Sequence, residues 1–258
     1  MPNSGRHLWE QTGARIPPFF RAPSTRYYRD CEISLFLEFF PLLKGKRLLK
    51  TDLWDEAKNT QILKWAEEKG ARVCGLDISS SILKEAWDSF DGRGRQRRFV
   101  ISDMRQMSFA DSSFDLLYSM GTVEHFAEYR LALQECRRVL KPGGRAIIGV
   151  PNKLDPFLRP LLVWVLNRLS LYAYGFEKSF SFRGLEALLR EAGFVIEDRT
   201  GILFLPGWLR LIDLWFHVRW PRVSFLFAPL VAPFAALYKK FKFLRRHGYL
   251  IACVVRKT

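Results

Sequence analysis

The 258-residue chain carries 41 Lys and Arg against 26 Asp and Glu, for a formal net charge of +15, and 48% of it is hydrophobic. That apolar content excludes an intrinsically disordered protein, because such a chain would collapse. The length suits one large α/β domain with an appendage. The charge is uneven, since residues 1–198 carry only +5, whereas the sixty residues from Arg199 carry +10 with Asp213 as their single acid.

The cysteines and the N-terminus favour a cytoplasmic protein. Residues 1–20 include Arg6, Glu10 and Arg15 and lack the continuous apolar run of a signal peptide. The cysteines form no Cys-x-x-Cys pair and no metal-ligand spacing with histidine, so we expect reduced, buried thiols and no metal site. They are Cys31, Cys74, Cys136 and Cys253.

The pattern along the chain predicts alternating strands and helices. Residues 1–25 show no period and predict a flexible arm or a lid, and residues 26–43 predict a covering helix. Strands are then expected at 47–51, 71–76, 98–101, 114–119 and 145–150, helices at 55–69, 80–90 and 127–140, and a turn at 141–144. This alternation predicts βαβ units and a parallel sheet covered on both faces.

Two acids follow expected strands directly, where ligands bind on parallel sheets. Asp77 could accept both hydroxyls of a ribose, and Asp103 could accept from an exocyclic amine. The alternative for Asp77 is that it caps the helix beginning at residues 78–80, a common role for Asp.

Four segments together resemble a class I S-adenosylmethionine-dependent methyltransferase of the group called methyltransferase type 11. The resemblance covers residues 45 to 152, with weaker echoes in Phe182–Val195 and Tyr249–Val255. It implies a Rossmann-like three-layer α/β/α sandwich with a mostly parallel sheet, and S-adenosylmethionine as cofactor. The segments are Val73–Ser79, Ser102–Met104 leading into Phe109–Asp115, Ser119–Phe126, and Glu135–Gly144.

The resemblance also assigns the cofactor to particular residues. It implies that Asp77 holds the ribose hydroxyls and that Asp103, with the backbone of Met104, holds the adenine. Ser119 and Met120 would face the methionine portion and the transferred methyl. The residues expected at the cofactor from these strand ends are Asp77, Ile78, Asp103, Met104, Ser119 and Met120.

The turn after the first expected strand departs from the family pattern. The family has a glycine-rich turn there, which lets the backbone approach the cofactor, whereas Leu48–Ala57 contains no glycine. We expect Thr51, Asp52 and Glu56 to supply acceptors for the cationic amino group of the methionine moiety. In the alternatives, Asp55 and Glu56 only complement a helix N-terminus, or the protein has lost its cofactor.

His125 is the candidate general base. A methyl on a sulfonium is already activated, so transfer needs in-line positioning and, for a hydroxyl or amine acceptor, removal of a proton. His125 is the imidazole nearest the expected site and titrates near neutral pH. The alternative is that it only orients backbone. His7, His217 and His247 are expected away from the reaction.

The region before the last strand is unusually apolar, in Pro156–Phe176, Ile202–Trp220 and Val223–Tyr238. Val223–Tyr238 has sixteen uncharged residues with two prolines, short of the roughly 20 that span a bilayer. Flanking Lys and Arg residues favour a helix lying on an anionic membrane surface. The alternative is a helical cap that lines a hydrophobic pocket, with its cations reaching outward.

We therefore expect methyl transfer from S-adenosylmethionine to a small-molecule or lipid-like acceptor, by a cytoplasmic protein peripheral at the inner membrane face. The alternative is a non-catalytic membrane-associated protein that retains the fold. A nucleic-acid methyltransferase is disfavoured, because the basic residues alternate with aliphatic blocks. The expected division is an arm and cover helix (1–44), a cofactor-binding core (45–152), an apolar helical segment (153–180), a return helix and strand (181–201), an apolar basic insertion (202–247) and the last strand (248–258).

Overall fold

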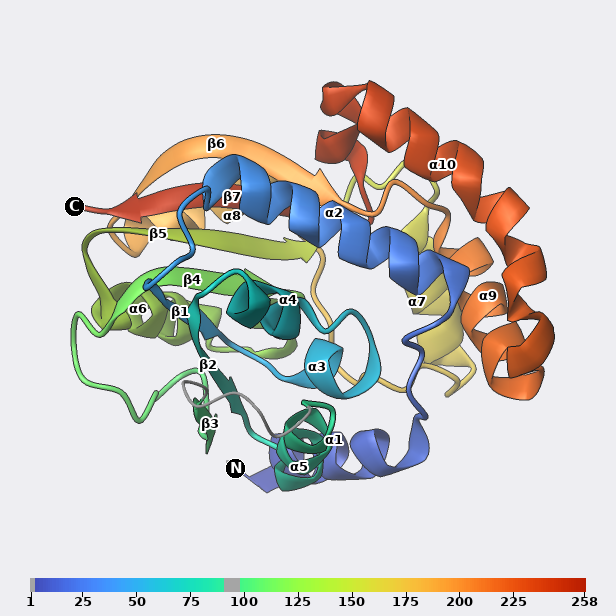
Figure 1. Cartoon of the computed structure of the whole chain (residues 1–258), viewed down its shortest axis with the longest axis horizontal. Coiled ribbons are helices and arrows are strands. Elements are labelled where there is room, and N and C mark those ends of the chain that lie inside the picture. Colours follow the sequence, from blue (N-terminus) through green and yellow to red (C-terminus); the bar gives the residue numbers. More distant parts are fainter. Residues whose placement is uncertain (1–2, 91–97) are drawn as a thin grey trace.

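The computed structural model describes residues 3–90 and 98–258. Its centre is a seven-stranded sheet with the order β3-β2-β1-β4-β5-β7-β6 (Figure 1). The strands β1 to β5 pair in parallel, and β7 lies antiparallel between β5 and β6. The strands are β1 Arg47–Lys50, β2 Arg72–Asp77, β3 Arg98–Ile101, β4 Phe114–Met120, β5 Leu140–Pro151, β6 Phe194–Ile202 and β7 Leu250–Lys257.

Helices cover both faces of this sheet, which confirms the predicted three-layer α/β/α sandwich. One buried cluster joins α2, α4, α5, α9 and α10 to one face, and a second joins α6 and α8 to the other. The α-helices are α1 Asn3–Arg15, α2 Pro23–Phe39, α3 Trp54–Lys58, α4 Ile62–Glu68, α5 Ser80–Asp88, α6 Tyr129–Val139, α7 Arg159–Arg168, α8 Phe182–Glu191, α9 Gly207–Arg219 and α10 Ala228–Lys240. The 3₁₀ segments are η1 Val123–His125, η2 Pro221–Phe227 and η3 Lys242–His247.

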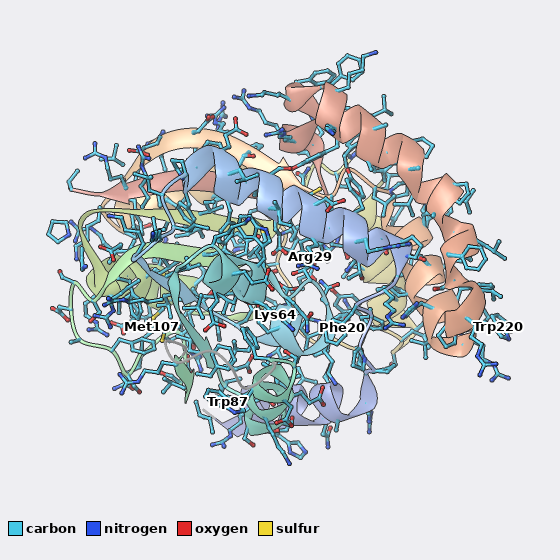
Figure 2. All side chains as sticks on the ribbon, in the orientation of Figure 1. Phe20, Arg29, Lys64, Trp87, Met107 and Trp220 are labelled. Carbon is cyan, nitrogen blue, oxygen red and sulfur yellow. The ribbon has the colours of Figure 1, made fainter. Side chains whose placement is uncertain are left out.

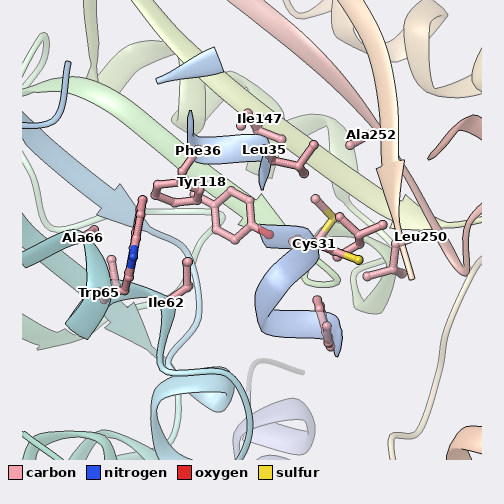
Figure 3. Packing of buried hydrophobic residues seen from close by; sticks show 14 of the residues in the cluster. Cys31, Leu35, Phe36, Ile62, Trp65, Ala66, Tyr118, Ile147, Leu250 and Ala252 are labelled. Carbon is pink, nitrogen blue, oxygen red and sulfur yellow. The ribbon is translucent and has the colours of Figure 1, made fainter. Parts of the chain in front are cut away.

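The first cluster is centred on aromatic side chains of α2 and β4. Phe36 and Tyr118 lie side by side with ring centroids 5.0 Å apart and near-perpendicular planes, the arrangement that aromatic quadrupoles favour (Figure 3). The Tyr118 hydroxyl donates to Glu32 Oε1 at 2.8 Å, so its buried polar end is satisfied. This packing fixes α2 across the sheet, directly above the strands that carry the site.

The N-terminal segment is more ordered than its sequence indicates. Residues 1–25 were expected to be aperiodic, but α1 occupies Asn3–Arg15, and α2 begins at Pro23 rather than residue 26. Proline suits the first turn of a helix because its missing N–H has no intrahelical partner there. Apart from Met1 and Pro2, which lie outside the described residues, the expected arm is therefore a helix followed by a short linker.

The single helix expected over residues 55–69 is two helices, α3 and α4. Asn59 ends α3, and its side-chain amide donates to Asp55 Oδ1 at 2.8 Å while its oxygen accepts from Thr25. Gln61 then adopts a φ of 56° before α4 begins. Side-chain hydrogen bonds to a distant helix thus outweigh the local helical periodicity.

The turn expected at residues 141–144 lies inside strand β5. Leu140 pairs with Phe114, and the next paired residue of β5 is Arg145, opposite Leu116. The intervening residues form a bulge, in which Gly143 takes a φ of 75° that favours glycine. The strand therefore begins as soon as α6 ends.

The C-terminal insertion is helical, as expected, and packs on α2. Leu209 of α9 and Val231 and Tyr238 of α10 are buried in the first cluster, and α10 lies beside α2 in Figure 1. Among the described residues, Pro221–Lys240 is one helical segment of 20 residues that is long and apolar enough to cross a membrane by length and composition alone. Val231 and Tyr238 pack into the core, while 17% of the apolar window is buried in total, so length and composition alone do not make this segment a span.

Candidate functional site

The carboxyl ends of β1 to β4 open into a cavity of about 480 Å³. Strand ends supply one wall, α1 and α2 contribute Trp9 and Tyr28, and α9 and the segment after α7 supply the opposite wall. A volume of this size accommodates small molecules. The predicted site residues that line it are Thr51, Asp52, Asp77, Ile78, Met104, Met120 and His125.

Asp77, at the end of β2, is fixed by two backbone N–H groups. Its Oδ2 accepts from Leu53 at 2.9 Å and its Oδ1 from Ser79 at 2.8 Å. The cap of α5 is Ser79, whose Oγ accepts from Ile82 N–H, so capping is not the role of Asp77. Burial raises the pKa of Asp77 to about 7, against the two backbone hydrogen bonds, which lower it. Each ionised oxygen can still accept a further bond.

The glycine-free turn after β1 is organised by a buried lysine. Lys50 is 0% exposed, and its Nζ lies 2.8 Å from Asp52 Oδ1, 3.1 Å from Asp55 Oδ2 and 3.5 Å from Glu56 Oε2. These acids hold the pKa of Lys50 well above its usual range although burial lowers it. The cation therefore lets an acid-rich turn fold inside the protein.

Of the three acceptors expected in this turn, two reach the cavity. Thr122 Oγ1 donates to Asp52 Oδ2 at 2.9 Å and lies 3.4 Å from Thr51 Oγ1, so both acceptors are positioned beside the end of β4. Glu56 is fully buried away from the cavity wall, and its Oε1 accepts from Leu63 N–H at 2.8 Å. It connects α3 to α4.

Asp103 lies beside the cavity without lining it. The Arg105 side chain donates two hydrogen bonds to the Asp103 carboxylate, from Nη2 to Oδ2 at 2.7 Å and from Nε to Oδ1 at 3.1 Å. The Arg105 backbone N–H also donates to Oδ1. These hydrogen bonds hold the pKa of Asp103 below its usual range, against burial, which raises it. Its neighbours Met104 and Arg105 do line the cavity.

Of the two residues expected at the cofactor from the end of β4, one lines the cavity and the other does not. Met120 lines the cavity, whereas Ser119 is fully buried away from it. Gly121 follows with a φ of 77°, a conformation that favours glycine, and turns the chain toward the cavity. Met120 Sδ lies where a side chain on Gly149 would be, so this glycine lets Met120 pack against β5.

His125 lies at the cavity with a defined tautomer. Its Nδ1 is 2.8 Å from the carbonyl oxygen of Phe176, which can only accept, so Nδ1 carries the hydrogen and Nε2 is free to accept a proton. Burial lowers the pKa of His125, so the ring is neutral at neutral pH. The Trp9 ring contacts it edge-on at 5.0 Å.

Glu124 is a site residue that the sequence reasoning missed. It is 2% exposed, lines the cavity, and its Oε2 has no hydrogen-bond partner within residues 3–90 and 98–258. Burial raises its pKa well above the usual range. Its position directly before His125 was the only available signal, because nothing in the local sequence indicates where its carboxyl points.

Helix α1 closes one side of the cavity, in the position of a lid. The Glu10 carboxylate accepts from the backbone N–H groups of Ser80 at 2.6 Å and Ser81 at 3.1 Å, at the beginning of α5. Hydrogen bonds from these serines lower the pKa of Glu10 to about 2, although burial raises it. Trp9 faces the cavity from the same helix and packs edge-on against Trp54 at 6.0 Å.

The wall opposite the strand ends is aromatic and holds two buried arginines. Arg159 pairs with Glu177, with Nη2 2.8 Å from Oε2, and its Cζ lies 4.2 Å from the centre of the Tyr249 ring. Arg210 lies 5.2 Å from the Tyr28 ring. Both come from the apolar segments around α7 and α9, whose sequences gave no sign of a place at the site.

Comparisons with known proteins agree with this geometry. Residues 57–148 match the methyltransferase domain family. Residues 57–148 thus form a methyltransferase domain. A solved S-adenosylmethionine-dependent methyltransferase from Mesorhizobium loti has a similar fold, with a TM-score of 0.58 at 17% identity over 88% of this chain and 98% of that one.

Curated relatives extend the match beyond the methyltransferase domain model. A ubiquinone biosynthesis O-methyltransferase of Chelativorans sp. is 27% identical over 160 residues, or 61% of this chain and 62% of that protein. A demethylmenaquinone methyltransferase of Thermus thermophilus is 32% identical over 121 residues, or 47% of this chain and 52% of that protein. The match thus spans about half to three fifths of these relatives' own length.

Proposed function

We propose that this protein transfers a methyl group from S-adenosylmethionine to an oxygen, nitrogen or carbon of a small-molecule or lipid-like acceptor. The observation that carries the proposal is one cavity that joins Asp77, at the strand end, to His125 and to an aromatic wall. The relatives named as quinone methyltransferases support an acceptor of this size and character.

The residues present fit the cofactor. Asp77 offers a fixed carboxylate for the ribose hydroxyls, and Met104 would lie against the adenine. Asp103 is held by Arg105 beside the cavity, so it would reach the adenine amine only when that pair opens. The unpartnered Oε2 of Glu124, together with Asp52, offers buried acceptors for the ammonium group of the methionine portion, whose positive charge would favour the ionised form of Glu124 against the burial that raises its pKa. When bound, S-adenosylmethionine supplies a methyl that is already activated as part of a sulfonium.

The chain's own contribution to transfer is positioning and proton removal. The aromatic wall orients the acceptor and excludes water, which strengthens the electrostatic contacts inside. His125 Nε2 accepts the proton of a hydroxyl or amine acceptor, while the Phe176 carbonyl keeps Nδ1 protonated and the ring oriented.

We also propose that the protein is cytoplasmic and peripheral at the inner face of the membrane. What supports this is the C-terminal apolar surface, meaning the exposed side chains Trp208, Ile212, Trp215, Phe225, Leu226 and Leu230 of α9, η2 and α10. This surface is flanked in sequence by the cations Arg219, Arg222, Lys239 and Lys240. Trp220 lies at the outer edge of the C-terminal helices (Figure 2). Apolar side chains between cations suit an anionic lipid interface.

Transfer of labelled methyl tests the proposal. The protein is incubated with S-adenosylmethionine labelled at the methyl group and with a panel of quinol-like, lipid and glycolipid acceptors. We expect the wild-type protein to transfer label to one acceptor class. The His125→Ala variant should transfer only a small fraction of that amount. Label in RNA instead would indicate a nucleic-acid methyltransferase, and cofactor binding without transfer to any acceptor would favour the non-catalytic alternative.

A further inference from the structure

Arg210 is a buried cation in the wall of the cavity. It projects from the first turns of α9, is 9% exposed, and lines the cavity together with Tyr28, Leu211 and Leu214. Its guanidinium lies 5.2 Å from the Tyr28 ring. The strand ends that would hold the cofactor line the same cavity, and Asn59 at the end of α3 links Arg210 to the turn after β1. Arg210 itself belongs to the C-terminal insertion and not to a strand end, which leaves it available to the acceptor.

The charge of Arg210 is balanced differently from that of other buried cations nearby. Lys50 contacts three carboxylates, and Arg159 is paired with Glu177. Arg210 Nη1 donates to Ser24 Oγ at 3.3 Å and Nη2 to Asn59 Oδ1 at 3.2 Å, and both acceptors are neutral. Within the described part of the chain no Asp or Glu oxygen lies within 4 Å of its guanidinium.

Two acids, Asp55 and Asp213, share the neutral residues that Arg210 contacts, but neither pairs with it directly, and Asp213 Oδ1 has no hydrogen-bond partner among the described residues. Asp55 Oδ1 accepts from the Asn59 amide at 2.8 Å and Oδ2 faces Lys50 at 3.1 Å. Asp213, one turn further along α9, accepts from the Ser24 backbone N–H through Oδ2 at 2.8 Å. A guanidinium has five N–H donors, so two neutral contacts leave donors for a ligand.

We propose that Arg210 binds a negatively charged group of the methyl acceptor, a carboxylate or a phosphate, and that the acceptor is therefore an anionic molecule with an apolar body. A guanidinium recognises both groups through paired hydrogen bonds. Leu211, Leu214 and the Tyr28 and Tyr174 rings supply the apolar surroundings for the rest of the molecule. This inference rests on the proposed function and adds the acceptor's chemical class.

Binding of matched anionic and neutral probes tests it. 4-Hydroxybenzoate is compared with 4-hydroxybenzamide, and hexyl phosphate with hexanol, by titration calorimetry with and without S-adenosylhomocysteine. We expect at least one anion to bind tenfold or more tightly than its neutral partner, and the pair that discriminates tells carboxylate from phosphate. Arg210→Gln should abolish that preference, and Arg210→Lys should restore part of it.

Arg183→Gln is the matched control, because Arg183 is an exposed arginine at the beginning of α8 that does not line the cavity, and this variant should leave both affinities unchanged. S-adenosylhomocysteine affinity should be the same in the Arg210→Gln variant, which separates this inference from cofactor binding. Equal binding of anion and neutral partner, no binding of either anion, or an anion preference that survives Arg210→Gln would overturn it. If Arg210→Gln fails to fold, the wild-type comparison and Arg210→Lys still decide.

Discussion

Asp77 is a buried ionisable group at the end of strand β2. Its carboxylate is 9% exposed, and burial raises its pKa to about 7. The helix that follows is capped by Ser79, so the acid is not needed there. An ionisable group at a strand end with a perturbed pKa and a cavity beside it is a candidate functional residue.

The affinity for S-adenosylhomocysteine should therefore fall with acidity through the neutral range. The ionised Asp77 accepts hydroxyl hydrogen bonds, and below pH 7 it becomes protonated and loses acceptor capacity. Between pH 8 and pH 6 we expect the affinity to fall by up to about tenfold. A group with a pKa of about 7 goes from mostly ionised to mostly protonated over this range, and its ionised fraction falls by about that factor. Calorimetry at each pH measures it.

The Asp77→Asn variant should bind more weakly at pH 8 and show a flatter pH profile. Its unfolding free energy should fall by about 1–3 kcal/mol, because the amide has one acceptor oxygen and leaves either the Leu53 or the Ser79 N–H without its partner, while removal of the buried charge offsets part of that loss. Asp88→Asn, at the exposed end of α5, is the control. A profile that keeps its slope in Asp77→Asn would assign the titration to another group.

His125→Ala should lower the turnover number by about 10²- to 10⁴-fold, the usual range for loss of a general base. Cofactor affinity should not change. In the wild type the rate should fall as pH drops below the lowered pKa of His125, since only the neutral ring accepts a proton. Steady-state kinetics test this, with His247→Ala in exposed η3 as control. Unchanged turnover in His125→Ala would remove the base assignment.

At the scale of elements, the turn between β1 and α3 has charged side chains where the family pattern has glycines. The Asp77 carboxylate holds the turn through the Leu53 N–H, and Lys50 offsets Asp52, Asp55 and Glu56. The sequence predicted that acids replace the glycines. It could not indicate that Lys50 points inward, because a lysine ending a strand is usually solvated.

Replacing Lys50 with Met should destabilise the fold by about 3–5 kcal/mol, since it leaves buried carboxylates without a counter-charge. Denaturant unfolding measures the change, and Lys46→Met, four residues earlier and exposed, serves as control. Because the uncompensated acids then favour protonation, part of the loss should be recovered at pH 5. A Lys50→Met protein as stable as wild type at pH 8 would contradict the structural role given to this cluster.

The positions of most strands and helices followed from periodicity, because each strand and each amphipathic helix carries its own local pattern. The elements that differed depend on distant contacts. Asn59 breaks a helix through its bonds to Asp55 and α2, and α1 is ordered where Glu10 meets α5. The bonds of Asn59 with Thr25 and of Glu10 with Ser80 join residues far apart in the chain, so no local window reports them.

For the whole molecule, most of the excess positive charge lies in the same C-terminal region as the exposed aromatic residues. The insertion has two sides, with Arg210 and Leu214 at the cavity and Trp208 and Trp215 exposed on the same helix, α9. The two alternatives drawn from sequence, a cap over a pocket and a membrane-facing surface, are thus compatible. Arg159 and Arg210 could not be assigned to the site beforehand, because only the folded insertion brings them to it.

Binding to anionic liposomes should depend on the cations that flank the C-terminal apolar surface. Neutralising Arg222, Lys239 and Lys240 with Gln should weaken it by up to about 3 kcal/mol, at roughly 1 kcal/mol for each cation. Flotation on anionic and on neutral vesicles measures this, with Lys69, Arg72 and Lys84 neutralised together as control. Wild-type protein that stays entirely in the soluble fraction would contradict membrane contact.

The central claim is that the cavity at the carboxyl ends of β1 to β4 binds S-adenosylmethionine despite its glycine-free turn. Isothermal titration with S-adenosylmethionine tests it most directly. We predict one binding site per chain, weakened at least tenfold by Asp77→Ala and unchanged by Asp88→Ala. Wild-type protein that gives no binding heat at millimolar cofactor would contradict the account and leave the chain as a non-catalytic protein with a methyltransferase fold.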